Sequence, residues 1–192
     1  MKTTLLALLL STVSISAFSQ GFVPVKLNNA DLSKRTKSGK VASWNTYNKD
    51  WPGNVTVLKD MDGSAYLNVK PTKSPTQKET MAMVGNKTHF SAQNGDTVRV
   101  RFLFRLKKMD RGALTSSVVL FSSNGGKYNQ WMPSFRTVMK MPVPNVWAKY
   151  DKTIVISKQP KAGTFSLNIH VRGKEVDLRD FAVEVKKHPG NK

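Results

Sequence analysis

The sequence predicts an all-β fold, an antiparallel sandwich or barrel of about ten strands in a single domain. Three observations predict it. The stretch 97–108, TVRVRFLFRLKK, alternates apolar and polar residues, as a half-buried strand does. Further short apolar runs follow at regular spacing, and Gly, Pro, Asn and Asp separate them. After residue 19, no long segment shows the 3.6-residue apolar period of a helix.

The first 19 residues have the features of a secretory signal peptide. Lys2 precedes the apolar run 5–10, LLALLL, and the small residues Ala17 and Ser19 stand just before a cleavage site at Gln20. The run is too short to cross a bilayer, so we predict no transmembrane segment. We therefore expect the cleaved protein to begin at Gln20 and to be secreted or periplasmic.

The rest of the chain is predicted to form one domain with short ends. Residues 20–40 are expected to form an N-terminal arm and the first strand, ending in the basic cluster SKRTKSGK. Residues 41–187 are the predicted sandwich, and 188–192 are a tail. No internal repeat and no long linker divides the sandwich.

Turn residues separate the strands in the first half of the sandwich. Pro52-Gly53-Asn54 and the run 60–63, DMDG, are the turns of a predicted hairpin. The segment 71–80 is polar and contains two prolines, so it is expected to be a loop. The strands predicted between these turns are 55–57, 65–69, 81–90 and 97–108.

The second half continues this pattern. The run 123–127, SNGGK, is a predicted turn, and Pro142 and Pro144 bracket a loop. Apolar and polar residues alternate strictly from Phe165 to Arg172. The strands predicted here are 114–122, 128–141, 146–157, 165–171 and 176–185.

The composition is strongly basic. The 192 residues include 31 Lys and Arg but only 12 Asp and Glu, which gives a formal net charge of +19. This charge predicts attraction to polyanions, and for an exported protein an acidic polysaccharide is a more natural partner than nucleic acid. The chain has no cysteine and three histidines, so disulfides and cysteine-ligated zinc are excluded and a transition-metal site is not expected.

Six short segments, in order along the chain, resemble those of carbohydrate-binding modules of the family 4/9 type. They are 28–32 (NNADL), Trp44, 62–69 (DGSAYLNV), 94–100 (NGDTVRV), 146–150 (VWAKY) and 176–183 (VDLRDFAV). The resemblance implies a galactose-binding-like β-jelly roll, a non-catalytic role and a polysaccharide ligand.

The resemblance also implies a cofactor. Many of these modules hold a structural calcium ion between their opening and closing acidic segments, so Asp31, Asp177 and Asp180 are the candidate calcium ligands here. The opening Glu of the family is absent from this chain. Asp180 could instead cap a turn or pair with a neighbouring Arg or Lys.

The predicted polysaccharide site combines aromatic residues in loops with nearby polar groups. Aromatic faces bind the apolar side of a pyranose ring, and aromatic residues in loops are less easily assigned to the core. The contacts predicted in this way are Trp51, Tyr128, Gln130 and Trp131. Trp147, in a regular strand, is expected in the core, and Trp44 fits either role.

The second component of the predicted site is a cationic sheet face. Alternation directs the cations of 97–108, 128–141 and 165–171 away from the core, and one shared sheet would gather them on one face. Arginine suits this role because its planar fork binds carboxylate or sulfate. The residues are Arg99, Arg101, Arg105, Arg136, Lys140, His170 and Arg172. The alternative is that these charges are scattered and solvated.

Two other functions stay open. Tyr128-Asn129-Gln130 and Asn168-Ile169-His170 resemble motifs of family 7 alginate lyases, which would make the protein a polysaccharide lyase acting on a uronic-acid polymer. The two motifs occur here in the reverse order, and the family's Arg-x-Glu-Leu-Arg strand is missing, so we predict no catalytic residue. The other alternative is a surface or matrix protein that binds polyanions nonspecifically.

Overall fold

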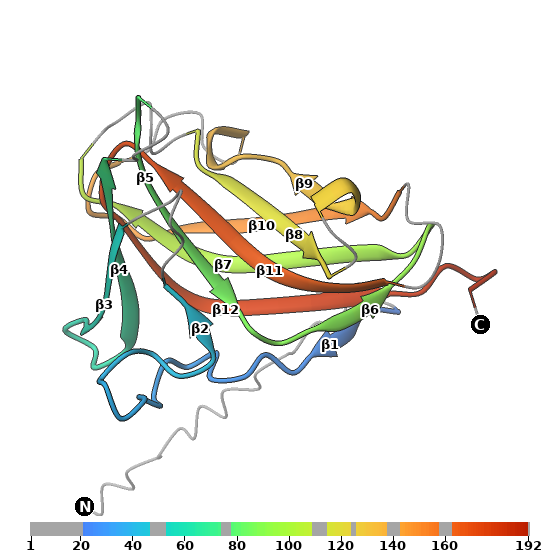
Figure 1. Cartoon of the computed structure of the whole chain (residues 1–192), viewed down its shortest axis with the longest axis horizontal. Helices are drawn as coiled ribbons and strands as arrows, with labels where there is room; N and C mark the ends of the chain where they lie inside the picture. Colours follow the sequence, from blue (N-terminus) through green and yellow to red (C-terminus); the bar gives the residue numbers. More distant parts are fainter. Residues whose placement is uncertain are drawn as a thin grey trace, which may run out of the picture.

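The computed structural model describes residues 21–46, 53–73, 78–108, 115–123, 126–137, 143–157 and 163–191. In this part of the chain the fold is all-β, with a 12-stranded antiparallel sheet that curls into a sandwich (Figure 1). The helical segments described are two short 3-10 turns, η1 (Gly126–Tyr128) and η2 (Phe135–Thr137). The predicted fold class is confirmed. None of the described segments is a helix long and apolar enough to cross a membrane.

The strands form two layers with the core between them. The first layer has the order β10-β7-β12-β4-β3, and β1 pairs with the second half of β12. Its strands are β1 (Val23–Val25), β3 (Gly53–Lys59), β4 (Ala65–Lys73), β7 (Thr97–Leu106), β10 (Ala148–Val155) and β12 (Val176–Lys186).

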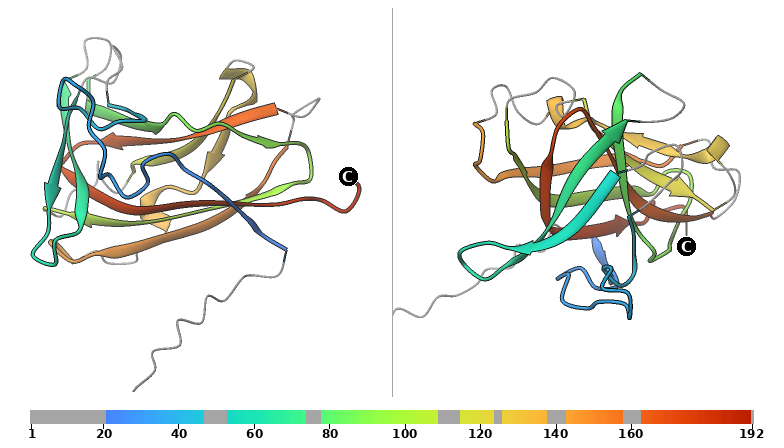
Figure 2. Two further views of the ribbon diagram at one scale, coloured as in Figure 1. Left: turned by 90° about the horizontal axis from the view of Figure 1, so that it is seen from below. Right: turned by 60° about the vertical axis from the view of Figure 1, so that its left-hand side comes forward.

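The second layer has the order β2-β5-β11-β8-β9, and β6 pairs with the start of β11. Its strands are β2 (Trp44–Asn45), β5 (Thr80–Asn86), β6 (Phe90–Ala92), β8 (Ser117–Ser122), β9 (Gln130–Met132) and β11 (Gly163–Arg172). Thr72 and Lys73 at the end of β4 pair with β5, so β4 joins the two layers. Figure 2 shows the hairpin of β3 and β4 standing at one end of the molecule.

Strand β7 lies near the centre of the first layer and supplies much of the core. The predicted alternation is confirmed, because every second residue from Val98 to Leu106 is buried. Phe102 stacks on Tyr150 of β10, with ring centroids 4.5 Å apart. Phe135 of η2 packs on Phe104 at 4.8 Å and closes this part of the core.

The N-terminal segment is folded onto the sandwich. Leu32 and Val41 are buried, and between them the chain turns back on itself through the bridge of Arg35 with Val41. The side chain of Asn29 holds this turn, because its Nδ2 donates to the carbonyl of Ala42 at 2.8 Å. Trp44 is a core residue: it packs on Phe181 at 4.5 Å.

The extended run expected at 128–141 is wrong. The described part of this stretch contains the end of η1, the three-residue strand β9 and the turn η2. Pro133 and Ser134 separate β9 from η2, so the alternation does not continue past Met132. Phe135 still points inward, but Arg136 is exposed on a turn rather than on a strand.

Candidate functional site

The outer face of the first layer carries the three arginines predicted on β7, and each is bound to a carboxylate. Arg99 donates from Nε and Nη2 to the two carboxylate oxygens of Asp151, both at 2.7 Å. Arg101 donates from Nη2 to Glu184 at 2.6 Å. The hydrogen bonds from Arg99 lower the pKa of Asp151 to about 2, so this carboxylate stays ionised near neutral pH.

Arg105 is the most enclosed of the three. Its Nε lies 2.9 Å from Asp177, which is fully buried, and its Nη1 lies 3.1 Å from Asp60. The guanidinium also lies over the rings of Tyr66 and Trp147, at 5.0 and 4.4 Å from their centroids. Arg105 therefore holds the framework of this layer together rather than offering a free cation.

Trp147 completes the same cluster. Its place in a regular strand predicts a core position, but Trp147 is half-buried on the outer face. Its Nε1 donates to Asp60 at 2.8 Å, and the guanidinium of Arg179 lies 4.4 Å from its ring centroid. The indole is thus held by charged neighbours on the outside of the sheet.

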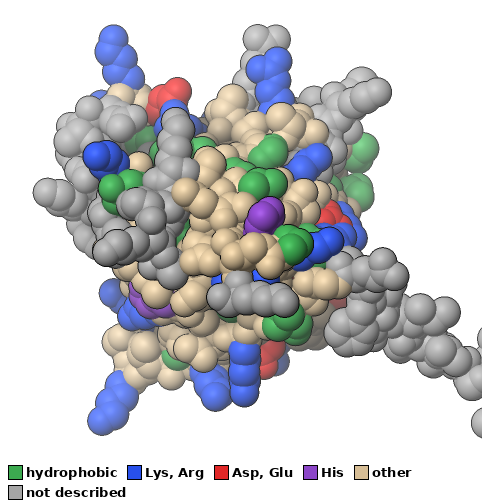
Figure 3. Space-filling view, turned by 90° about the vertical axis from the view of Figure 1, so that its right-hand side faces the viewer, with side chains coloured by type: hydrophobic (Ala, Val, Ile, Leu, Met, Phe, Trp, Pro, Cys, Tyr) green, Lys and Arg blue, Asp and Glu red, His purple; other side chains and the backbone are tan. Residues whose placement is uncertain are grey.

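The cationic face expected from three strands is divided. β12, β4 and β5 separate β7 from β11, so Arg99, Arg101 and Arg105 lie on a different layer from His170 and Arg172. Among the residues described, every carboxylate except that of Asp31 lies within ion-pair distance of a Lys or Arg. The excess positive charge therefore lies mainly on exposed lysines, and Figure 3 shows Lys and Arg side chains projecting around one end of the molecule.

The outer face of the second layer carries a different set of side chains. A transverse row crosses it, and the pairings that define the row are Trp131 with Val119, Val119 with Asn168, Asn168 with Gly85, and Gly85 with Asn45. Phe121 and His170 lie on either side of this row. We call these seven residues the Trp131 face. Trp131 is 56% exposed and Phe121 is 41% exposed, whereas Asn168 and His170 are buried beside them.

Gly85 leaves room for the polar group at the middle of this row. A Cβ atom at Gly85 would lie 2.2 Å from Oδ1 of Asn168, so only glycine lets the amide lie flat across β5. Nδ2 of Asn168 points along its own strand, 3.2 Å from Oγ of Ser166. The row therefore has a buried amide at its middle, between the exposed ring of Trp131 at one edge and the exposed Asn45 at the other.

The ring of His170 packs against the ring of Trp131, beside the transverse row. The two rings meet edge to face, with centroids 5.8 Å apart. Burial lowers the pKa of His170 to about 4, and the charge of Arg172 adds to the effect. His170 is therefore neutral at physiological pH. Arg172 is half-buried at the end of β11 and lies 3.5 Å from Glu79.

Gln130 and Tyr128 take other roles. Gln130 points to the opposite side of β9 from Trp131 and is buried, and its Nε2 donates to the carbonyl of Ser157 at 2.8 Å. It therefore ties β9 to the end of β10. Tyr128 is half-buried in η1, with the ammonium of Lys127 5.8 Å from its ring. Gln130 points into the core and His170 lies on the outer side of the layer, so these two side chains of the lyase-like motifs do not meet in one site.

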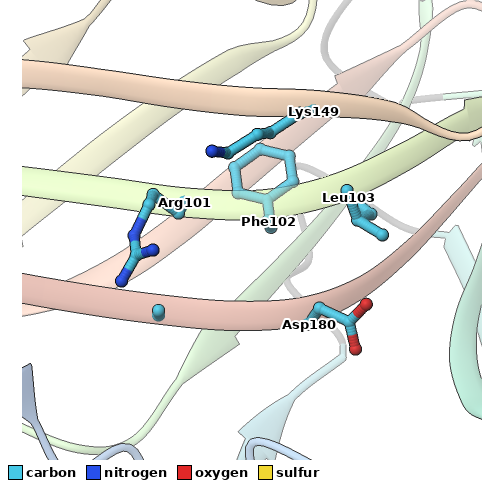
Figure 4. Close-up of a pocket in the computed structure, with 6 residues that line it drawn as sticks. Arg101, Phe102, Leu103, Lys149 and Asp180 are labelled. Atoms are coloured by element: carbon cyan, nitrogen blue, oxygen red, sulfur yellow. The ribbon is translucent and has the colours of Figure 1, made fainter. Parts of the chain in front are cut away.

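A pocket of about 260 Å³ opens on the outer face of the first layer, where β12 bulges away from β7 (Figure 4). Arg179 pairs with Leu103, but the next pair is Ala182 with Arg101, so β12 has one extra residue here. The residues that line the pocket are Arg101, Phe102, Leu103, Lys149, Asp180 and Ala182.

The three candidate calcium ligands are not gathered into one site. Asp177 binds Arg105 and Lys107, Asp180 lies 3.6 Å from Arg179, and Asp31 accepts a hydrogen bond from the backbone of Ser33. The described ranges contain no group of three His, Cys, Asp or Glu residues that could hold a metal ion. Trp51 and Lys140, two of the predicted ligand contacts, lie outside the described residues.

Phe121 and the pocket at the β12 bulge are two features that the sequence-based prediction does not include. Phe121 follows the alternation of β8 and could have been placed opposite the core from its position between Leu120 and Ser122. No sequence pattern predicts the pocket, because the pocket depends on the extra residue in β12 and on the pairing of β12 with β7.

Comparisons with known proteins identify the fold. No protein-family model matches the chain, and no curated protein matches its sequence. Among solved structures, a Stig cyclase, FisC, from Fischerella sp. TAU matches with a TM-score of 0.55 and 11% identity, covering 86% of this chain and 98% of the cyclase. That cyclase is in complex with an indole compound.

A carbohydrate-binding module shows the same likeness. The CBM22-1 and GH10 modules of endo-1,4-β-D-xylanase 10B from Clostridium thermocellum, complexed with xylohexaose, match with a TM-score of 0.50 and 12% identity. The match covers 77% of this chain and 26% of the xylanase chain. The likeness does not single out family 4/9. At these identities it shows the fold alone: this chain has a β-sandwich that carbohydrate-binding modules and Stig cyclases share.

Proposed function

We propose that the protein binds a polysaccharide, without catalysis, on the Trp131 face. The observation that carries the proposal is the large exposed area of Trp131, on a face that also exposes Phe121 and Asn45. Sugars present an apolar C–H face and a rim of hydroxyl groups. The indole ring can stack on the first, and the exposed amide of Asn45 can bind the second.

The length of the row suits a polymer better than a single sugar. It crosses five neighbouring strands, from β9 to β2. Adjacent strands lie about 4.8 Å apart, so the row spans roughly 19 Å. The net charge of +19 favours an acidic polymer, because the exposed lysines would attract it from beyond the distance of direct contact.

Affinity electrophoresis tests the proposal. The protein would be run through gels that contain xylan, β-glucan, alginate, pectate or a sulfated galactan, at low and at moderate salt. We expect one polymer to retard the protein at moderate salt, and Trp131→Ala to weaken this binding about 30-fold, as for a hot-spot aromatic residue worth about 2 kcal/mol.

A matched control separates the site from general effects. Val155 on β10 is also 56% exposed, but it lies on the other layer, so Val155→Ala should keep full binding. Equal retardation of Trp131→Ala and the parent protein would refute the proposal.

Nonspecific adhesion to polyanions is a second candidate function. The turn between Leu32 and Val41 presents Lys34, Lys37 and Lys40 to solvent, and its backbone is held by the hydrogen bond from Thr36 to the carbonyl of Lys40 at 2.8 Å. If this turn alone accounts for binding, every polyanion in the series should retard the protein at low salt. Moderate salt should then abolish the retardation, because exposed charges are screened.

A further inference from the structure

We infer that the pocket at the β12 bulge is a second binding site, for a sugar acid: a small ring that carries one carboxylate and several hydroxyl groups. The pocket lies on the first layer and the Trp131 face on the second. The inference therefore does not need the proposed function, and either could fail without the other.

The bulge creates the space. Asp180 has a φ of 58°, in the left-handed region, and this turn of the backbone directs Phe181 inward. The Phe181 ring is then buried against Trp44 and Phe102. The small side chain of Ala182 follows, so no large group of β12 covers the outer surface of Leu103.

Two cations lie along one side of this space. Figure 4 shows Lys149 and Arg101 on one side of the pocket, Leu103 further along β7, and Asp180 at the β12 edge. Lys149 binds Asp151 at 3.0 Å but is 60% exposed, so its ammonium has donors left for a ligand. Arg101 is fixed by its contact with Glu184 at 2.6 Å, and 35% of its side chain is exposed. Both cations are therefore held in place and still have exposed N–H groups that a ligand could reach.

The pocket combines three kinds of contact that a sugar acid matches together. Lys149 and Arg101 can bind a carboxylate, and the exposed carboxylate of Asp180 can accept hydrogen bonds from ring hydroxyl groups. Leu103 and Ala182 offer an apolar floor to the C–H face of the ring.

Other ligand classes match fewer of these contacts. A simple inorganic anion makes no use of the apolar floor, a neutral sugar leaves the cations unused, and a second carboxylate would be repelled by Asp180. The volume of about 260 Å³ is below the usual ~300–1,000 Å³ of drug-sized ligand sites, so it suits one sugar residue.

Titration of the full chain with galacturonate, followed by amide chemical shifts in NMR spectra, tests the inference. We expect saturable shifts at residues 101–103, 149 and 180–182, and no comparable shifts with galactose or acetate. Ala182→Leu should abolish the shifts, because the larger side chain fills the pocket while every charge remains. Lys149→Met should weaken binding at least fivefold.

The controls keep the result interpretable. Lys174→Met removes an exposed lysine outside this pocket and should change nothing, and Trp131→Ala should leave galacturonate binding intact. The same spectra report whether each variant is folded. Equal shifts with acetate, or unchanged binding in a folded Ala182→Leu variant, would overturn the inference.

Discussion

The pair of Gly85 and Asn168 shows how one missing side chain shapes the Trp131 face. The amide of Asn168 occupies the space above Gly85 that any other residue would fill. Nearly all of Asn168 is buried, so its position is set by these neighbours rather than by solvent. The middle of the row therefore depends on glycine at this position of β5.

Gly85→Ala tests this dependence. The new methyl group would lie 2.2 Å from Oδ1 of Asn168, so we expect a loss of about 1–3 kcal/mol in the free energy of unfolding, as for other overpacked sites. Asn168→Ala removes the clashing atoms, so the double variant should recover part of that loss. Urea denaturation of the two single variants and the double variant measures the coupling. Additive losses would show that the two side chains do not compete for this space.

Among the strands, β12 contains the bulge on which the pocket depends. A regular strand here would place a side chain over Leu103 and close the pocket. The bulge instead requires a left-handed backbone at Asp180, which Asp adopts more readily than most residues but less readily than Gly.

Substitutions at Asp180 separate backbone conformation from charge. We expect Asp180→Val to lower the free energy of unfolding by about 1–2 kcal/mol, because a β-branched residue is strained at this φ. Asp180→Gly should be neutral or slightly stabilising by the same reasoning. Chemical denaturation measures both, and equal stability of the Val and Gly variants would contradict the conformational argument.

The elements also show how far sequence reasoning reaches. The alternation of β7 and β11 predicts their bounds to within two residues and their core-facing residues, because burial on one face of a strand imposes a period of two. It does not predict that Asn168 and His170, on the other side of β11, are buried as well. The stretch 128–137 does not follow its predicted alternation, because its buried residues come from the three-residue strand β9 and the turn η2, which share no period.

At the scale of the whole molecule, one buried carboxylate joins the end of the chain to the sandwich. Asp96, in the turn before β7, is fully buried. It accepts hydrogen bonds from the backbone of His188 at 3.0 Å and from the side chains of Lys187 and Asn191, both at 2.9 Å. The segment predicted as a tail is therefore fixed at residues 188–191.

The acid stability of the protein should depend on Asp96. Burial alone would raise its pKa, but the hydrogen bonds from Asn191, Lys187 and His188 outweigh burial and lower it to about 2. Because the unfolded chain has a pKa near 3.8, the stabilisation is complete above that pH and is lost as pH falls toward 2. It amounts to about 2 kcal/mol.

Asp96→Asn checks this expectation. The variant should unfold about 2 kcal/mol more easily than the parent at pH 7, and the two should converge between pH ~4 and ~2. Urea denaturation over a pH series measures the difference. Glu79→Gln is the control, because it also replaces a carboxylate by an amide but at an exposed position, where little loss of stability at pH 7 is expected. A difference for Asp96→Asn that is constant with pH would contradict the argument.

The arrangement of the two layers also explains why the site prediction was only partly right. Sequence patterns showed which side of each strand faces the core, but not which strands are neighbours. Arg101 and His170 both face outward from their strands, yet β12, β4 and β5 lie between them. Which acids neutralise the arginines likewise depends on pairing, as with Arg101 of β7 and Glu184 of β12.

Arginines make most of the ion pairs and lysines carry most of the exposed charge, and this difference has a chemical consequence. The ion pairs of the sheet are made mostly by arginines, whose guanidinium groups do not lose their charge in water. The exposed charge is carried mostly by lysines that hold no carboxylate among the described residues, such as Lys37, Lys87 and Lys174. Amine acylation acts on lysine and spares arginine, so such a modification would remove most of the exposed positive charge while the arginine ion pairs of the sheet remained. The lysine contacts to the buried Asp96 and Asp177 are the exceptions, because Lys187 and Lys107 would lose their charge as well.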